Sequence, residues 1–377
     1  MTDFETMVHD PSPPVDRRRR VDPWTLVLGI LGGVLLGTGV TFAILGATGV
    51  FQEPTPPTIP PPPVLDAPPP TGPPPTLSDT VTATDVASLV IPSIVAVEVN
   101  SLLSQGSGSG VVYGSDGYII TNNHVIEGTN QISVIFADGA RFPAELVGTD
   151  PETDLAVLLV DRPDLAPITL GSSDSLVIGE PAIAVGNPLG LRGGPTVTSG
   201  IVSALNRTLG VNGGDALYGL VQTDAPIAPG SSGGALVNAR GELIGITTAI
   251  AVSDVGAEGL GFAVPVDLVV AIANDLIVHG EIRHALLGIA GRTAWASQNG
   301  AEYPAGVGVT ALPAASAFEE AGGRVNDVIY QIGDFEVTTI DELLAALRRM
   351  RAGDIVEIFV LRSDEDVTLL VELDELR

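Results

Sequence analysis

The sequence predicts a mainly β protein that follows a single transmembrane helix. From about residue 85 to residue 280, short segments rich in Val, Ile and Thr alternate with turns of Gly, Asn and Asp. Many short strands at such spacing are typical of β-barrels. Nearer the N-terminus, one long apolar stretch carries no charge, and the C-terminal region adds further β-rich segments and one helical pattern.

The N-terminal region is predicted to anchor the chain in the cell membrane. Residues 24–51 have no charged side chain. As a helix they extend about 42 Å, more than the roughly 30 Å of a bilayer core, whereas a cleaved signal has an apolar core of only about 7–15 residues. Arg17 to Arg20 precede the stretch. The positive-inside rule therefore leaves residues 1–20 in the cytoplasm and the rest of this single-pass chain extracytoplasmic.

Residues 52–78 form a proline-rich segment, which favours the extended polyproline II conformation. We interpret it as a spacer that holds the following domains away from the membrane. The alternative is a ligand for an SH3-type domain.

Composition limits the classes of partner. The chain has 377 residues, enough for two or three domains, and a formal net charge of −28. Residues 1–20 carry four acidic and four Arg side chains, so the whole excess lies on residues 21–377. Such a surface argues against nucleic acid as a partner, because phosphate binding needs basic residues. Cysteine is absent, and no motif predicts a metal or a cofactor.

Residues 79–280 are predicted to be one β domain. Its candidate strands are Ile94–Val99, Gly110–Tyr113, Ile132–Phe136, Ala156–Val160, Ala182–Val185, Gly200–Leu205, Gly219–Gln222, Gly234–Val237, Leu243–Thr248 and Gly261–Val264. A helix over residues 266–278 leads out of the domain. The Gly/Ser-rich residues 100–109 are predicted to be a short loop.

The stretch from Thr223 to Gly234 has the composition of a serine-nucleophile loop. Ser232 supplies a hydroxyl, and Gly230 permits a tight turn that aims the Gly230 and Ser232 N–H groups at an oxyanion. Gly233 and Gly234 leave room for a substrate backbone. Because Gly-Ser runs are also common in ordinary loops, the prediction depends on suitable partners for Ser232.

One histidine is suited to be the base. His124 follows a β-rich run and is predicted to take the proton of Ser232. Asp154 is predicted to orient the imidazole, although an Asp before an apolar run is also a common turn residue, and Asp150 is the fallback. The chain order His124, Asp154, Ser232 is that of chymotrypsin. The other three histidines are His9, His279 and His284.

These segments resemble the HtrA (Deg) family of trypsin-like serine proteases, from about residue 85 to the C-terminus. The family motifs TNxHV, TDLAV and GNSGG correspond to Thr121–Val125, Thr153–Val157 and Gly230–Gly234, in the same order. Further matches are Gly186–Gly190, Thr196–Ser203 and Gly261–Pro265. The resemblance implies a chymotrypsin-like domain of two six-stranded β-barrels, with the catalytic triad in the cleft between them.

The resemblance also implies an oxyanion hole formed by Gly230, Ser231 and Ser232. Ser231 replaces the usual Asn of the motif, which is tolerable because this position contributes mainly backbone. Ala228 replaces another Asn, a change that could loosen the loop. Pro226 stands where trypsin-like enzymes hold an acid, so cleavage is expected after small or medium apolar residues.

Residues 281–377 resemble a PDZ domain, a β-sheet with two helices. Leu286, Leu287, Gly288 and Ile289 match the loop whose N–H groups capture a peptide C-terminus while the peptide adds as a strand. Residues 326–333 resemble the segment GDVIxxING of that domain.

One helix of this domain is predicted from spacing alone. Its apolar residues are Ile340, Leu343, Leu344, Leu347 and Met350. Thr339 and Glu342 predict a capping box at its start. The arginines at positions 348, 349 and 351 are predicted to be a solvated helix end.

The resulting expectation is a membrane-anchored, extracytoplasmic serine endopeptidase that cleaves unfolded, misfolded or regulatory proteins. The resemblance implies a homotrimer, although residues 79–112 lack the aromatic side chains that many family trimers use. The alternatives are a catalytically idle chaperone with a protease fold, a PDZ binding or sensor module, and a signalling protease with one specific substrate.

Overall fold

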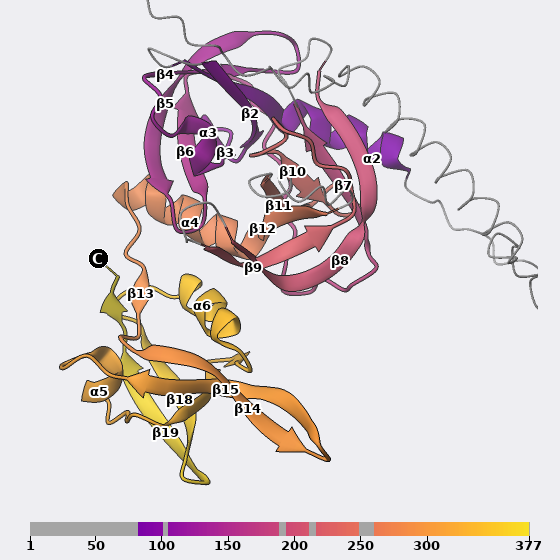
Figure 1. Cartoon of the computed structure of the whole chain (residues 1–377). Coiled ribbons are helices and arrows are strands. Elements are labelled where there is room, and N and C mark those ends of the chain that lie inside the picture. Colours follow the sequence, from indigo (N-terminus) through magenta and orange to yellow (C-terminus); the bar gives the residue numbers. More distant parts are fainter. Residues whose placement is uncertain (1–81, 101–104, 188–193, 211–215, 249–259, 377) are drawn as a thin grey trace, which may run out of the picture. The chain divides into compact units, whose positions relative to one another are not determined.

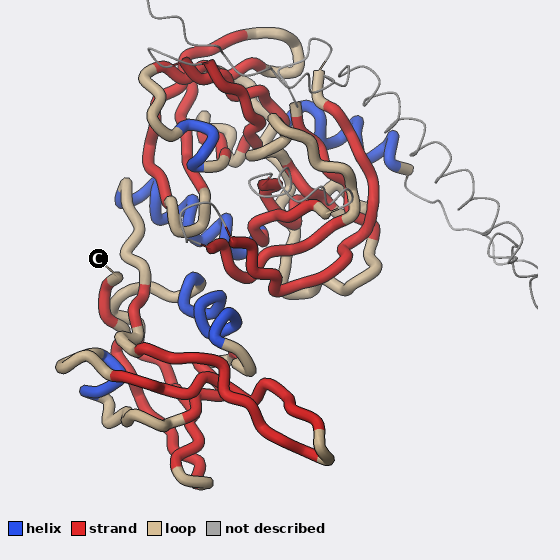
Figure 2. The backbone as a smooth tube through the Cα atoms, viewed as in Figure 1, coloured by secondary structure: helices blue, strands red, loops and turns tan. Residues whose placement is uncertain are grey.

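The structure, a computed structural model, describes residues 82–100, 105–187, 194–210, 216–248 and 260–376. The predicted cytoplasmic tail (1–20), membrane anchor (24–51) and linker (52–78) lie outside these residues. Among the residues that are described, no helix is long and apolar enough to cross a membrane. The described chain is mainly β, as the sequence predicts (Figure 1 and Figure 2).

The first six strands form a closed barrel in the order β1-β2-β3-β6-β5-β4. They are β1 (Ile94–Asn100), β2 (Gln105–Val112), β3 (Tyr118–Thr121), β4 (Gln131–Ile135), β5 (Arg141–Asp150) and β6 (Leu155–Val160). Fully buried residues such as Val97, Val112 and Leu158 fill its interior. Two short helices, α2 (Ala83–Val90) and η1 (Ile91–Ser93), precede it. The turn α3 (Asn123–Ile126) follows β3.

The second barrel repeats this arrangement, in the order β10-β11-β12-β9-β8-β7. Its strands are β7 (Pro181–Gly186), β8 (Thr196–Gly210), β9 (Ala216–Thr223), β10 (Ala235–Val237), β11 (Leu243–Thr248) and β12 (Gly261–Pro265). The predicted exit helix is α4 (Val266–His279), which ends where Gly280 adopts a left-handed φ of 77°. Two six-stranded barrels are therefore present, as the resemblance implies.

The strand prediction missed part of the first barrel. No separate strand was expected at β5, whose residues include charged side chains and Pro143. The predicted loop over residues 100–109 is shorter than expected, because Asn100 pairs with Gln105 and β2 continues from there along β1. The Gly and Ser residues of β2 have low strand propensity, so its pairing with β1 overrides the local preference.

The C-terminal domain contains a sheet in the order β14-β15-β16-β18-β19 and two helices. Its elements are β13 (Ala285–Leu286), β14 (Ala290–Gln298), β15 (Ala301–Ala311), α5 (Ala317–Glu320), β16 (Val328–Ile332), β17 (Phe335–Glu336), α6 (Ile340–Arg348), β18 (Ile355–Arg362), β19 (Glu365–Glu372) and β20 (Asp374–Glu375). The predicted capping box of Thr339 and Glu342 begins α6. Leu343 and Leu347 of α6 are buried in the core of this domain.

The prediction that the arginines at the end of α6 form a solvated helix end is wrong. Arg349 forms an ion pair with Asp174, at 2.7 Å between Nη2 and Oδ1. Arg348 and Arg351 pair likewise, with Glu152 and Asp275. A local helical pattern does not reveal these partners, because they belong to the barrels and to α4.

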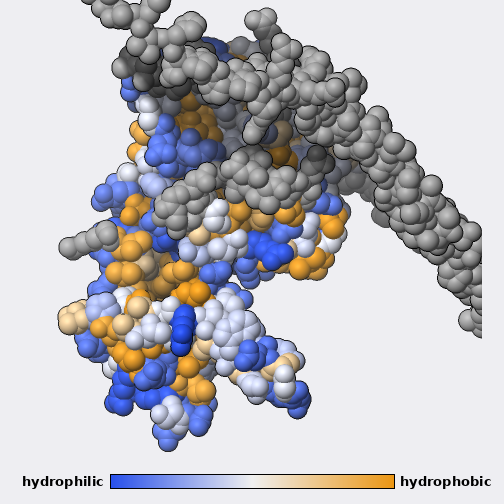
Figure 3. Space-filling model, viewed as in Figure 1, coloured by the Kyte–Doolittle hydropathy of each residue, from blue (hydrophilic) through white to orange (hydrophobic). Residues whose placement is uncertain are grey.

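Hydrophobic and hydrophilic residues are interspersed over the described surface on the face that Figure 3 shows. A few large apolar side chains are well exposed, among them Leu89 of α2 at 66%. Val177 and Ile178, in the turn before β7, are exposed at 63% and 61%.

Candidate active site

The loop that carries Ser232 connects β9 to β10 and contains a tight turn. The Ser231 N–H donates to the Ala228 carbonyl at 2.9 Å, which closes the turn over Pro229 and Gly230. Gly230 has a φ of 90°. Pro followed by a Gly with positive φ is the signature of a type II turn. Ser232 follows directly, with only 5% of its surface exposed.

Gly233 and Gly234 also meet a packing requirement within the chain itself. A Cβ atom on Gly233, which has a φ of 83°, would lie 2.2 Å from the Ser109 carbonyl oxygen. One on Gly234 would lie 2.6 Å from the Val185 carbonyl oxygen. These glycines therefore let the loop pack against the chain's own strands, a requirement that the sequence analysis did not anticipate.

The structure brings His124 and Asp154 together. His124 lies in α3, after β3, and Asp154 lies between β5 and β6. The imidazole Nδ1 is 2.8 Å from Asp154 Oδ2 and 3.0 Å from Oδ1. The backbone N–H of His124 also donates to Asp154 Oδ1 at 3.0 Å. The carboxylate is thus placed to hold both the ring and the backbone of His124.

The Asp154 segment is itself tightly held. Asp154 is 4% exposed and has a φ of 57°, a left-handed conformation that is uncommon for a residue other than glycine. Its carbonyl accepts hydrogen bonds from the Asn123 N–H and the Asn122 Nδ2. Thr248, at the end of β11, donates its hydroxyl to Asp154 Oδ2 at 3.2 Å. The sequence prediction did not single out Thr248, which comes from the other barrel.

The fallback acid, Asp150, has another partner. His284 Nε2 lies 2.8 Å from Asp150 Oδ1, and both side chains are buried. Asp150 Oδ2 accepts a hydrogen bond from Thr153. The geometry therefore places Asp154 against His124, and Asp150 against a histidine that leads into the C-terminal domain. No local pattern in the sequence pairs Asp150 with His284.

Ser231 and Pro226, the other predicted site residues of this loop, form hydrogen bonds through their backbones. The Ser231 N–H, which is predicted to contribute to the oxyanion hole, donates to the Ala228 carbonyl. The Ser231 carbonyl accepts the Thr247 hydroxyl at 2.7 Å. Pro226 is exposed, and its carbonyl accepts the Thr198 hydroxyl at 2.8 Å.

The predicted carboxylate-binding loop connects β13 to β14. Leu286 ends β13, and Leu287 is 1% exposed, with its carbonyl accepting the Phe318 N–H at 3.2 Å. Gly288 has a φ of 71°, and a Cβ atom there would lie 2.6 Å from Ser316 Cβ. Ile289 packs against the core of the domain and leads into β14.

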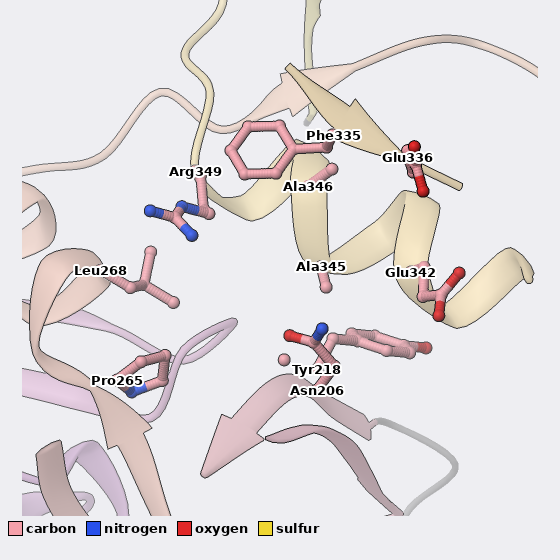
Figure 4. Close-up of a pocket in the computed structure, with 11 residues that line it drawn as sticks. Asn206, Tyr218, Pro265, Leu268, Phe335, Glu336, Glu342, Ala345, Ala346 and Arg349 are labelled. Carbon is pink, nitrogen blue, oxygen red and sulfur yellow. The ribbon is translucent and has the colours of Figure 1, made fainter. Parts of the chain in front are cut away.

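A small pocket of about 110 Å³ lies where α6 approaches β9 of the second barrel (Figure 4). Arg349, on one side, stacks over the Phe335 ring at 4.9 Å. Tyr218 lies on the opposite side, and its neighbour Gly219 also lines the pocket. A Cβ atom on Gly219 would be 3.2 Å from Ala345 Cβ, so this glycine allows α6 to approach β9 closely. The strand β9 leads into the loop of Ser232.

Comparison with known proteins agrees with this arrangement. A model of the trypsin-like peptidase domain matches residues 108–246, and a model of the PDZ domain matches residues 285–373. The chain is 38% identical over 315 residues to the periplasmic pH-dependent serine endoprotease DegQ of Escherichia coli, which covers 76% of this chain and 68% of DegQ. It is 35% identical over 367 residues to the serine protease PepD of Mycobacterium tuberculosis, covering 92% and 76% of the two chains.

Solved structures give the same result. The HtrA-type protease AlgW with a tripeptide is 36% identical, with a TM-score of 0.66, over 78% of this chain and 98% of that one. A serine endoprotease from Yersinia pestis is 32% identical, with a TM-score of 0.58 over 78% of this chain.

The two aspartates provide a first test. Asp154→Asn removes the charge that faces His124 Nδ1, so we expect labelling of Ser232 by a fluorophosphonate probe to slow by roughly 10⁴-fold, the scale seen when a triad aspartate is amidated. Asp150→Asn is the matched control and should slow labelling far less. Labelling rates that fall equally in both variants, at equal folded fraction by circular dichroism, would contradict the assignment of the acid.

Proposed function

The chain belongs to the HtrA family of serine proteases and is a serine endopeptidase with a PDZ domain, and we propose that Ser232, His124 and Asp154 form its catalytic triad. The observation that carries this proposal is the contact of His124 Nδ1 with the buried Asp154 carboxylate, 2.8 Å away. The chain order and the glycine turn beside Ser232 support it further.

In the proposed mechanism, the Ser232 hydroxyl attacks the scissile carbonyl while His124 takes its proton. His124 then protonates the leaving amine, and Asp154 orients the imidazole and stabilises its charged form. Water completes the reaction through the same base. The imidazole must be neutral to accept the proton.

The N–H groups of Gly230 and Ser232 are the proposed oxyanion donors. Such groups stabilise charge that develops only in the transition state, and each is worth about 10²–10³-fold in rate. Ser231 is left out, because its N–H is used to close the turn onto Ala228. The departures from the family motif at positions 228 and 231 involve residues that contribute their backbone to this turn, so they do not favour an idle protease.

The proposed specificity is for small or medium apolar residues at the cleaved bond. Pro226, in place of an acid, offers no charge to a Lys or Arg side chain. Ile227 is partly buried, and its side chain lies close enough to Gly261 that a Cβ there would be 2.6 Å away. Both features suit apolar substrates of the kind that misfolded chains expose.

We assign the loop of Leu286, Leu287, Gly288 and Ile289 to the capture of peptide C-termini. Backbone N–H groups of such a loop bind the terminal carboxylate while the peptide pairs with an edge strand. The edge strand β14 directly follows this loop. The HtrA-type protease AlgW has been solved with a tripeptide, which is consistent with this assignment.

Substitution of the proposed nucleophile provides the central test. The purified full chain should degrade casein, and Ser232→Ala should abolish this activity, because no other hydroxyl is paired with His124 in the proposed mechanism. A peptide with an apolar C-terminus should change the rate of the wild type if the PDZ domain regulates cleavage. Equal inertness of wild type and variant toward unfolded substrates would favour the alternative of a chaperone or sensor module with an idle protease fold.

A panel of peptide substrates tests the proposed cleavage specificity. Among peptides that differ only at the residue before the cleaved bond, kcat/KM should be highest for Val, Ala or Leu and lowest for Lys and Arg. The physical reason is that Pro226 and Ile227 are apolar and offer no negative charge to a Lys or Arg side chain. Preferred cleavage after Arg would refute it.

Localisation and assembly are proposed together. We propose that residues 24–51 anchor the chain, that both domains are extracytoplasmic, and that three chains associate through their protease domains. DegQ and DegP are named periplasmic, and exposed apolar residues such as Leu89 are available for subunit contacts. Detergent, but not high salt, should release the full chain from membranes. Release by high salt would refute the anchor.

The protein released by detergent should sediment as a trimer. Sedimentation as a monomer at micromolar concentration would refute the trimer.

A further inference from the structure

Ser109 lies at the centre of a hydrogen-bond cluster beside the nucleophile loop. It belongs to β2 of the first barrel and is completely buried. Its hydroxyl donates to the Gly230 carbonyl at 2.8 Å and accepts from the Asn187 N–H at 2.8 Å. One side chain thus connects the turn beside Ser232 with the end of β7.

The backbone of the same residue also contacts the site. The Ser109 N–H donates to the Ser232 carbonyl at 2.7 Å. The Ser109 carbonyl accepts the Thr121 hydroxyl, also at 2.7 Å. Gly233 lies so close to this carbonyl that no side chain fits at position 233. Ser109 is therefore attached to the loop at two points, the carbonyl of Gly230 and the carbonyl of Ser232 itself.

The hydroxyl has a particular effect on the turn. Glycine adopts positive and negative φ values with similar ease. The residue type at position 230 therefore does not by itself fix the orientation of the two peptide planes that adjoin it. A hydrogen bond to the Gly230 carbonyl fixes the plane of the Gly230–Ser231 peptide. That plane also carries the Ser231 N–H, which closes the turn onto Ala228. Side chain and turn therefore restrain the same peptide group from its two ends.

We propose that Ser109 is a positioning residue for the oxyanion hole: its hydroxyl holds the Gly230–Ser231 peptide so that the N–H groups of Gly230 and Ser232 face the reacting carbonyl. This inference rests on the proposed triad and deepens it. Ser109 touches no substrate, because it is fully buried. It acts only through the loop. A serine is required because the position needs a donor and an acceptor in one small side chain.

The test compares Ser109→Ala with Ser173→Ala in the full chain. Ser173 is a matched control, since its hydroxyl also donates one hydrogen bond and accepts one, both with Asp267 at the start of α4. We expect Ser109→Ala to lower kcat about 10–100-fold, somewhat less than the loss of an oxyanion donor itself. KM should change less than about threefold, because ground-state binding is not involved. Ser173→Ala should retain wild-type kcat.

A second readout separates positioning from loss of structure. A peptide boronate, which mimics the tetrahedral oxyanion, should bind Ser109→Ala more weakly by the same factor as kcat/KM falls. A non-cleavable substrate analogue should bind both variants as it binds the wild type. If the alanine variant does not fold, Ser109→Cys keeps the side-chain shape and weakens both hydrogen bonds, because a thiol is a poor donor and acceptor. The same losses are expected from it.

The inference is overturned if Ser109→Ala keeps the kcat of Ser173→Ala, or if the loss lies in KM while boronate affinity is unchanged. The proposed triad fails in a recognisably different way. In that case wild type and Ser232→Ala turn over substrate alike, and no reaction remains for Ser109 to serve.

Discussion

The proposed active site depends on the close approach of the two barrels along β2. Across this junction the Ser109 N–H reaches the Ser232 carbonyl, and a Cβ atom on Gly108 would lie only 3.2 Å from the same oxygen. In the opposite direction, Thr248 of the second barrel reaches the Asp154 carboxylate. The histidine and the acid come from one barrel and the hydroxyl from the other. Neither barrel alone therefore contains all three residues of the proposed triad.

This closeness also explains why small residues surround Ser232. Protein interiors are packed at the density of organic crystals, so two backbones meet this closely only where one of them lacks a side chain. Gly233 and Gly234 satisfy that condition against Ser109 and Val185. Gly219 does the same where α6 meets β9. A glycine at a contact between distant segments is thus a packing requirement before it is a catalytic one.

The sequence predicts the parts of the site whose chemistry is rare and whose motifs are local. The chain has only four histidines, so His124 stands out, whereas Asp154 is chosen over Asp150 through the resemblance of Thr153–Val157 to a family motif. The alternation of apolar residues and turns predicts most barrel strands. Ser109 and Thr248 give no such signal, because an isolated serine or threonine in a strand gains its role only when segments far apart in the chain meet. The pairing of Asp150 with His284 is unpredictable for the same reason.

The five residues from Asp150 to Asp154 have a double attachment. Asp154 holds His124, whereas Asp150 and Glu152 contact His284 and Arg348 of the PDZ side. Linkage is reciprocal: a ligand of the C-terminal domain whose affinity depended on these contacts would in turn shift them, and with them the segment that carries Asp154. These five residues therefore connect the proposed triad with the C-terminal domain through one short stretch of backbone.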